Sequence, residues 1–168
     1  INVSEKPWIL TQSSPDEGTI SARSGAITDN QNSTLAIKAN YSADDSIRFY
    51  YKVSSETGYD NFLVKIDGIE VLRKSGDISW TKTAVGVKKG MNKIEWIYKK
   101  DGSISSGSDC AFVDLVDFAG ASSVTYITRD IMAAKLVSPL QSATMGIENV
   151  AVSLLNLGPD TIKGFNIA

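Results

Sequence analysis

The sequence contains no histidine among its 168 residues. This absence removes the commonest general base, the Ser-His-Asp and Cys-His catalytic arrangements, and every zinc site that needs an imidazole ligand. The chain also has a single cysteine, Cys110, so no disulfide can form within it. Its stability must therefore come from a packed core or from bound ions.

Strong net charge is missing as well, because 17 basic residues nearly balance 19 acidic ones and leave a formal charge of −2. The sequence has neither the basic patch typical of nucleic-acid binding nor a polybasic stretch for an anionic membrane surface. No apolar run approaches the length of about 18 residues that a membrane helix needs. We therefore expect no nucleic-acid partner and no membrane insertion.

The residues that are present indicate a globular chain, since 42% are apolar and the charges are balanced. The length suits one domain, or one domain with a fragment of another. Cys110 heads an apolar run, which favours a small buried side chain over a reactive thiol. The first residues lack the pattern of a signal peptide, so we expect a mature fragment or an excised domain.

Strand signals dominate the first two thirds of the chain. Ile47, Phe49, Tyr51 and Val53 alternate with polar residues, which predicts a strand with one buried face. Asp67-Gly68 separates two apolar runs and suits a two-residue type I′ turn, so we predict a hairpin there. The predicted strands cover residues 33–39, 46–53, 62–66, 69–73, 80–87, 93–98 and 111–118.

Many short strands without a long helix favour an all-β fold, specifically an antiparallel β-sandwich. The composition changes near Ser122, because twelve of the fourteen aromatic residues precede it. We therefore predict two domains, residues 1–121 and 122–168. The second part, called the tail below, has predicted strands at 130–137, 150–155 and 164–167. Helical spacing within 129–137 also suggests a short helix, but the length and the following Ser138-Pro139 favour a strand.

Several blocks occur in an order that resembles one known module: SARSG (21–25), DNQ (29–31), FYYKVSSE (49–56), WIYKKD (96–101) and AFVD (111–114). Over residues 8–120 the chain resembles the adhesin-type jelly roll of the cleaved-adhesin and MAM-like, concanavalin-like group. Such modules accompany secreted bacterial proteases and large surface proteins. The resemblance implies a jelly-roll sandwich from a secreted or cell-surface bacterial protein.

The tail resembles the opening of an immunoglobulin-like surface domain, which often follows such jelly rolls. The resemblance implies an incomplete domain whose missing strands leave an open edge at 150–155. We therefore expect the tail to allow a homodimer.

The fold and extracellular setting of the resembled group suggest a structural calcium ion, which prefers oxygen ligands. The natural donors are Asp29, Asn30, Asp109 and Asp114. Alternation places Asp114 on one strand face with Phe112, Val116 and Phe118, where an isolated carboxylate would be costly. The alternative is that these side chains cap loops by accepting backbone N–H bonds, as Asp and Asn commonly do.

Sugar-binding sandwiches present aromatic faces together with amides and carboxylates that bond hydroxyl groups. The candidates least committed to the predicted core faces are Trp80, Tyr59 and Tyr50, with Asp60 and Asn61 beside Tyr59. Trp8 and Trp96 are predicted to lie in the core. The alternative is that each candidate is a half-buried aromatic residue that serves only packing.

Catalysis has little support, because Glu70 and Glu95 alternate with apolar residues and have no acidic neighbour on their strands. We expect no enzyme, although the parent protein can be a secreted protease or hydrolase. The sequence favours a non-catalytic binding or adhesion module that targets host protein or glycan. The alternatives are a carbohydrate-binding module of a glycoside hydrolase and a structural spacer that stabilises a secreted protease.

Overall fold

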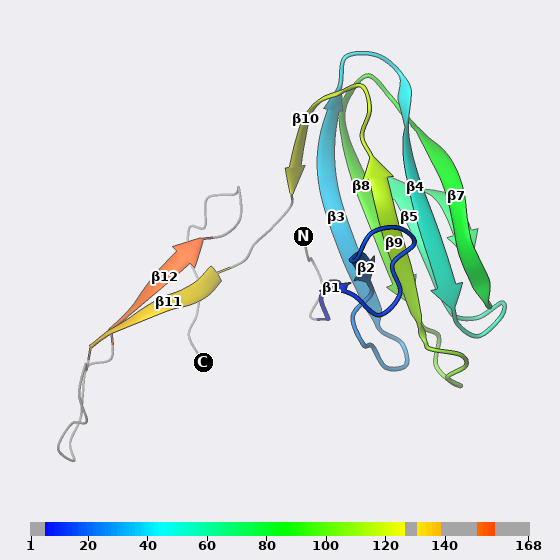
Figure 1. Cartoon of the computed structure of the whole chain (residues 1–168), viewed down its shortest axis with the longest axis horizontal. Coiled ribbons are helices and arrows are strands. Elements are labelled where there is room, and N and C mark those ends of the chain that lie inside the picture. The colour runs from blue at the N-terminus through cyan, green and yellow to red at the C-terminus, as the bar shows by residue number, and fades with distance from the viewer. Residues whose placement is uncertain (1–5, 127–130, 139–150, 157–168) are drawn as a thin grey trace. The chain divides into compact units, whose positions relative to one another are not determined.

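The computed structural model describes residues 6–126, 131–138 and 151–156, and Figure 1 shows their strands. Contacts divide the chain into two compact units, Ile1–Ile127 and Thr128–Ala168. Every regular element in the described residues is a β-strand, which confirms the predicted all-β class. No helix in this part of the chain is long and apolar enough to cross a membrane.

Ten strands of the first unit form two five-stranded sheets in which all neighbours are antiparallel. The β9 sheet has the order β1 (Ile9–Thr11), β2 (Ser21–Arg23), β9 (Cys110–Asp117), β4 (Asp45–Ser54) and β7 (Ile78–Val87). The β8 sheet has the order β10 (Ala121–Tyr126), β3 (Asn32–Tyr41), β8 (Gly90–Lys99), β5 (Asn61–Ile66) and β6 (Ile69–Lys74). The two sheets stack as a jelly-roll sandwich, as predicted (Figure 1).

The core lies between the sheets and consists of the alternate residues of facing strands. The predicted inward face of β4, Ile47 to Val53, is buried, and so are Trp8 and Trp96. Phe49 meets Trp96 edge to face with ring centroids 5.8 Å apart. Such an aromatic pair adds about 0.5–1.5 kcal/mol beyond the burial of its area. The period-two alternation therefore identified the buried face of β4 correctly.

The predicted hairpin between β5 and β6 is confirmed. Asp67 and Gly68 have φ values of 50° and 82°, and Ile66 pairs with Ile69 across the turn. Positive φ at both central positions defines the type I′ turn, whose twist matches that of the flanking strands.

β9 contains a β-bulge that the sequence did not reveal. Tyr50 pairs with Asp114 but Arg48 pairs with Asp117, so β9 has one extra residue there, and Leu115 has a φ of 48°. An extra residue exchanges the faces of the side chains on either side of it. Val113 and Val116 consequently both contact the core.

The bulge corrects the predicted environment of Asp114. Phe112 and Asp114 lie on the outer face of the β9 sheet, whereas Val116 and Phe118 pack against the core. The prediction that all four share one buried face was wrong, because it assumed unbroken alternation through Leu115.

The first and last strands of this unit had not been expected. β1 and β2 have three residues each, which is too short for alternation to show. β10 spans the predicted boundary near Ser122 and pairs with β3 at the edge of the β8 sheet. The two-domain assignment, with boundaries 1–121 and 122–168, stays a prediction.

Among the described residues of the second unit, β11 (Ile131–Ser138) and β12 (Ala151–Asn156) form a two-stranded antiparallel sheet. The preference for a strand over a helix at 129–137 agrees with β11. The predicted strand at 164–167 lies outside the described residues.

Candidate functional site

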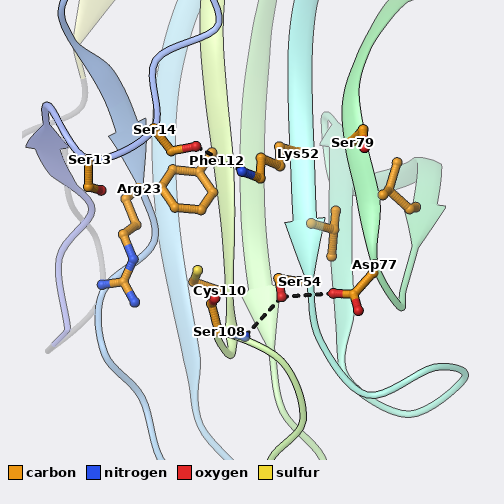
Figure 2. A pocket seen from close by; sticks show the side chains of 12 residues that line it. Ser13, Ser14, Arg23, Lys52, Ser54, Asp77, Ser79, Ser108, Cys110 and Phe112 are labelled. Atoms are coloured by element: carbon orange, nitrogen blue, oxygen red, sulfur yellow. Dashed lines mark hydrogen bonds between the residues drawn. The ribbon is translucent and has the colours of Figure 1, made fainter.

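A groove of about 580 Å³ lies on the outer face of the β9 sheet (Figure 2). We call it the outer groove. Its walls and floor come from β2, β4, β7 and β9 and from the loops that precede β2, β7 and β9. It is lined by Ser13, Ser14, Arg23, Lys52, Val53, Ser54, Asp77, Ile78, Ser79, Ser108, Cys110 and Phe112.

Two cations flank an aromatic ring in this groove. Arg23 of β2 and Lys52 of β4 both pair in register with Phe112 of β9. The guanidinium carbon of Arg23 lies 6.0 Å from the ring centroid, and Lys52 Nζ lies 5.7 Å from it. Lys52 Nζ also donates a hydrogen bond of 2.8 Å to Ser14 Oγ. The ring and the serine therefore fix the position of the lysine ammonium.

The opposite wall of the groove carries a carboxylate (Figure 2). Ser54 Oγ donates to Asp77 Oδ1 at 2.8 Å and accepts from the Ser108 backbone N–H at 2.9 Å. Gly107 comes so close to Ser54 that a Cβ there would collide with its Oγ, and its φ of 69° also favours glycine. The loop before β9 thus orients Asp77 through Ser54.

Cys110 lies in the floor of the groove and is 1% exposed. Burial raises the pKa of its thiol, an effect that the neighbouring Arg23 partly opposes. The prediction that Cys110 is a buried small side chain is confirmed.

The structure separates the predicted sugar-binding residues into two groups. Tyr50 and Trp80 lie on the outer face of the β9 sheet but do not line the groove. Trp80 meets the edge of Phe112 at 6.2 Å, and the Tyr50 ring is covered by Lys82 Nζ at 5.5 Å. Both rings therefore already make a contact on the sheet face, which leaves less of their surface for stacking.

Of the other three, Tyr59 and Asp60 lie in the loop between β4 and β5, and Asn61 is the first residue of β5. Tyr59 is 61% exposed, whereas Asp60 is fully buried. Asn61 donates its side-chain N–H to the Tyr59 carbonyl. Asp60 is therefore turned into the protein and cannot contact a ligand beside Tyr59.

The predicted metal ligands each have different hydrogen-bond partners within the protein. Asp109 accepts hydrogen bonds from Tyr98 Oη at 2.7 Å and from Lys100 Nζ at 2.6 and 2.7 Å. Asp114 accepts backbone N–H bonds from Asp16 and Leu115.

The remaining two predicted ligands lie before β3. Asp29 is exposed, and Asn30 donates its backbone N–H to the Asp101 carbonyl. The carboxylates of Asp29, Asp109 and Asp114 do not form one group among the described residues. The bonds at Asp114 match the loop-capping alternative.

The structure contains an acidic cluster that the sequence analysis did not predict. Oxygens of Glu56, Asp60 and Asp101 lie within 4.8 Å of one another, so the group could hold a metal ion. Glu56 Oε2 is buried without a hydrogen-bond partner. Burial, followed by the negative charges of Asp101 and Asp60, raises the pKa of Glu56. Glu56 and Asp60 lie in the loop between β4 and β5, whereas Asp101 lies in the loop after β8, so the sequence alone did not indicate this group.

Lys100 forms a buried ion-pair network beside this cluster. Its Nζ lies 2.9 Å from Asp60 Oδ2 and 2.6 Å from Asp109 Oδ2, and the lysine side chain is 1% exposed. Burial alone would lower the pKa of Lys100, but hydrogen bonds to Asp109 and Asp60 outweigh it and raise the pKa. For Asp109, burial would raise the pKa, but the bonds from Lys100 and Tyr98 lower it.

The two glutamates considered for catalysis are engaged in ion pairs. Glu70 pairs with Arg73 at 2.7 Å, and Glu95 pairs with Lys93 at 2.6 Å.

No protein-family model matches the sequence, and no curated protein matches it. Similar solved structures include the secreted serine protease VesC from Vibrio cholerae, with 14% identity, a TM-score of 0.52 and coverage of 67% of this chain. Another is the CBM22-1 xylan-binding domain of Paenibacillus barcinonensis Xyn10C, with 11% identity, a TM-score of 0.47 and coverage of 69% of this chain and 81% of that domain. A third is CBM35 from Paenibacillus barcinonensis, with 16% identity, a TM-score of 0.34 and coverage of 68% of this chain and 97% of that module. The chain spans 22% of the length of the VesC chain. At such identities, the likeness to VesC concerns the fold alone, a β-sandwich.

Proposed function

We propose that the chain is a non-catalytic binding module of a secreted or cell-surface bacterial protein, and that the outer groove takes a glycan. The observation that supports glycan binding is the lining of the groove, which includes five serine residues, two cations and one carboxylate. Such a set can donate to and accept from the many hydroxyl groups of a sugar. A volume of about 580 Å³ lies within the range of small-molecule sites, about 300–1,000 Å³.

The module would serve adhesion by attaching its parent protein to a host glycan or glycoprotein. The adhesin-like resemblance supports this role, and so does the similarity in fold to part of a secreted protease. A carbohydrate-binding module of a glycoside hydrolase would use the same groove. A structural spacer of a protease would leave it without a ligand.

A glycan array probed with the full chain tests the proposal. Ser79 is exposed on the groove wall, so Ser79→Trp should fill the groove and abolish binding. Ala84→Trp is the matched control, because Ala84 is exposed on the same strand but does not line the groove. Binding that survives Ser79→Trp would place the site elsewhere, and Trp80→Ala with Tyr59→Ala would then test the predicted aromatic residues. A chain that binds no glycan would favour the spacer.

We further propose that the metal which the acidic cluster could hold is calcium, the ion favoured by carboxylate oxygens. Glu56, Asp60, Asp101 and the adjacent Asp109 supply four carboxylates against the one ammonium of Lys100, an excess of three negative charges. Asp114 lies outside this cluster and already accepts two backbone N–H bonds, so it supports this role less. Calcium should raise the melting temperature of the wild type but not of Glu56→Gln. A melt unchanged by calcium and by EDTA would contradict the proposal.

The tail is proposed to pair with a second copy of the chain. An isolated two-stranded sheet is marginally stable, and the outer edges of β11 and β12 have no partner strand among the described residues. Light scattering at several concentrations should show a monomer–dimer equilibrium that is lost when residues 128–168 are removed. A monomer at all concentrations would contradict it.

A further inference from the structure

We propose that the outer groove selects a sugar residue that carries a carboxylate, such as a hexuronate or a sialate. This inference rests on the proposed function, since it names the ligand class of the same groove. The carboxylate would lie between Arg23 and Lys52, and the hydroxyl groups of the sugar would reach the serines and Asp77.

The first support is unpaired positive charge. Neither Arg23 nor Lys52 forms a salt bridge in the described part of the chain. More exposed cations on the surface do have partners, as Lys88 has Asp44 and Arg48 has Asp117. Both groove cations are instead held against Phe112, at 6.0 and 5.7 Å from its ring. An anion bound beside the ring would be attracted by both charges and could accept charge-assisted hydrogen bonds from them.

The outer groove also exposes little aromatic surface. Phe112 is only 6% exposed, because the two cations lie over it and Trp80 packs at its edge. The nearby Tyr50 ring is covered by Lys82. A neutral sugar that depends on stacking would find no bare ring here, so ionic and hydroxyl contacts must supply the affinity.

The third support distinguishes a sugar acid from a dense polyanion. Asp77 stands on the opposite wall, oriented by Ser54, and would repel a chain with closely spaced negative charges. The same carboxylate accepts hydrogen bonds from hydroxyl groups. One acidic group followed by hydroxyls therefore fits both walls better than an acidic peptide does.

The experiment is a calorimetric titration of the full chain with oligosaccharides ending in glucuronate, galacturonate or N-acetylneuraminate, each beside its neutral counterpart. Because a hydrogen bond to a charged group is stronger than one between neutral groups, an acidic sugar should bind about tenfold more tightly or better than its neutral counterpart. Arg23→Gln and Lys52→Gln should each reduce that preference, and Lys52→Arg should retain it. Lys82→Gln is the matched control, because it removes a cation from the same sheet face outside the groove. The three acids distinguish hexuronate from sialate.

Other outcomes overturn the inference. Equal binding of neutral and acidic sugars would refute the charge selection while leaving the glycan-binding function intact. Binding of no sugar would refute both. Equal competition by a polyglutamate peptide would show that the groove takes any carboxylate. Arg23→Gln and Lys52→Gln must leave the melting temperature unchanged for their binding data to count. Because they alter separate strands, a folding defect in one variant leaves the other informative.

Discussion

Replacement of Lys100 by methionine should strongly destabilise the sandwich. Lys100 Nζ contacts Asp60 at 2.9 Å and Asp109 at 2.6 Å, and the exposed fractions of the three side chains are 1%, 0% and 23%. Methionine fills a similar space but removes the charge. It therefore leaves the Asp60 carboxylate buried beside Glu56 and Asp101 with no cation.

The expected loss of unfolding free energy follows from the burial of this ion pair. Removing one partner of a buried pair costs about 3–5 kcal/mol, because the remaining charge is neither solvated nor neutralised. Asp60 keeps the backbone N–H of Asp101, and Asp109 keeps the Tyr98 hydroxyl, so the loss should not exceed that range. For a domain of this size, the melting temperature should fall by about 10–15 °C.

Urea unfolding of wild type and variants measures the effect. Lys88→Met is the matched control, because the Lys88–Asp44 pair has the same chemistry but side chains that are 85% and 60% exposed. It should cost far less stability than Lys100→Met, because water screens an exposed ion pair. Asp60→Asn should cost less in the Lys100→Met background than alone, if the two charges interact. Equal losses for Lys100→Met and Lys88→Met would refute the reasoning.

Three further predictions concern pH, a thiol and a glycine. Burial would raise the pKa of Asp109, but hydrogen bonds from Lys100 and Tyr98 outweigh it and lower the pKa. The stability that Asp109 contributes is therefore complete above the unfolded pKa of about 3.9 and is lost as the pH falls through the folded pKa. Unfolding free energies measured at decreasing pH should show this loss, and the loss should be smaller in Lys100→Met. Cys110 should react with a thiol reagent far more slowly in native protein than in urea, because it is buried and its pKa is raised; equal rates would contradict the described floor of the groove. Gly25→Ala should cost about 1–3 kcal/mol, because a Cβ there would lie 2.6 Å from the Pro7 carbonyl oxygen, whereas Gly86→Ala, with open space, should cost little in the same urea experiment.

The sequence predicted the fold where the signal is local. Alternation with period two marks a strand that buries one face, and β4 and β8 show it over their whole inward faces. The Asp67-Gly68 turn is equally local, since two positive φ angles are needed and both residue types tolerate them. β2 has only three residues, and its place depends on pairing with β9, which is distant in the chain.

The site could be predicted only in part for the same reason. The outward direction of Tyr50 and Lys52 follows from alternation in β4. The row of Arg23, Phe112 and Lys52 depends on the strand order β2-β9-β4, which no single segment specifies. Asp60 was expected beside Tyr59 at a sugar site, but the charge of Lys100 holds it inside. A single sequence shows which residues are neighbours along the chain, whereas an ion pair such as Lys100–Asp60 joins residues that are distant in the sequence.

The bulge at Leu115 links the core to the outer groove. Because the faces exchange there, β9 buries Val113 before the bulge and Val116 after it, and Asp114 is left on the outer face. Asp114 accepts the Asp16 backbone N–H at 3.0 Å, which fastens the loop before β2 over that face. The same loop brings Ser14 to Lys52 at 2.8 Å and so builds one wall of the groove. A strand without the extra residue could not both continue the core and hold this loop, so the register that completes the sandwich also shapes the groove.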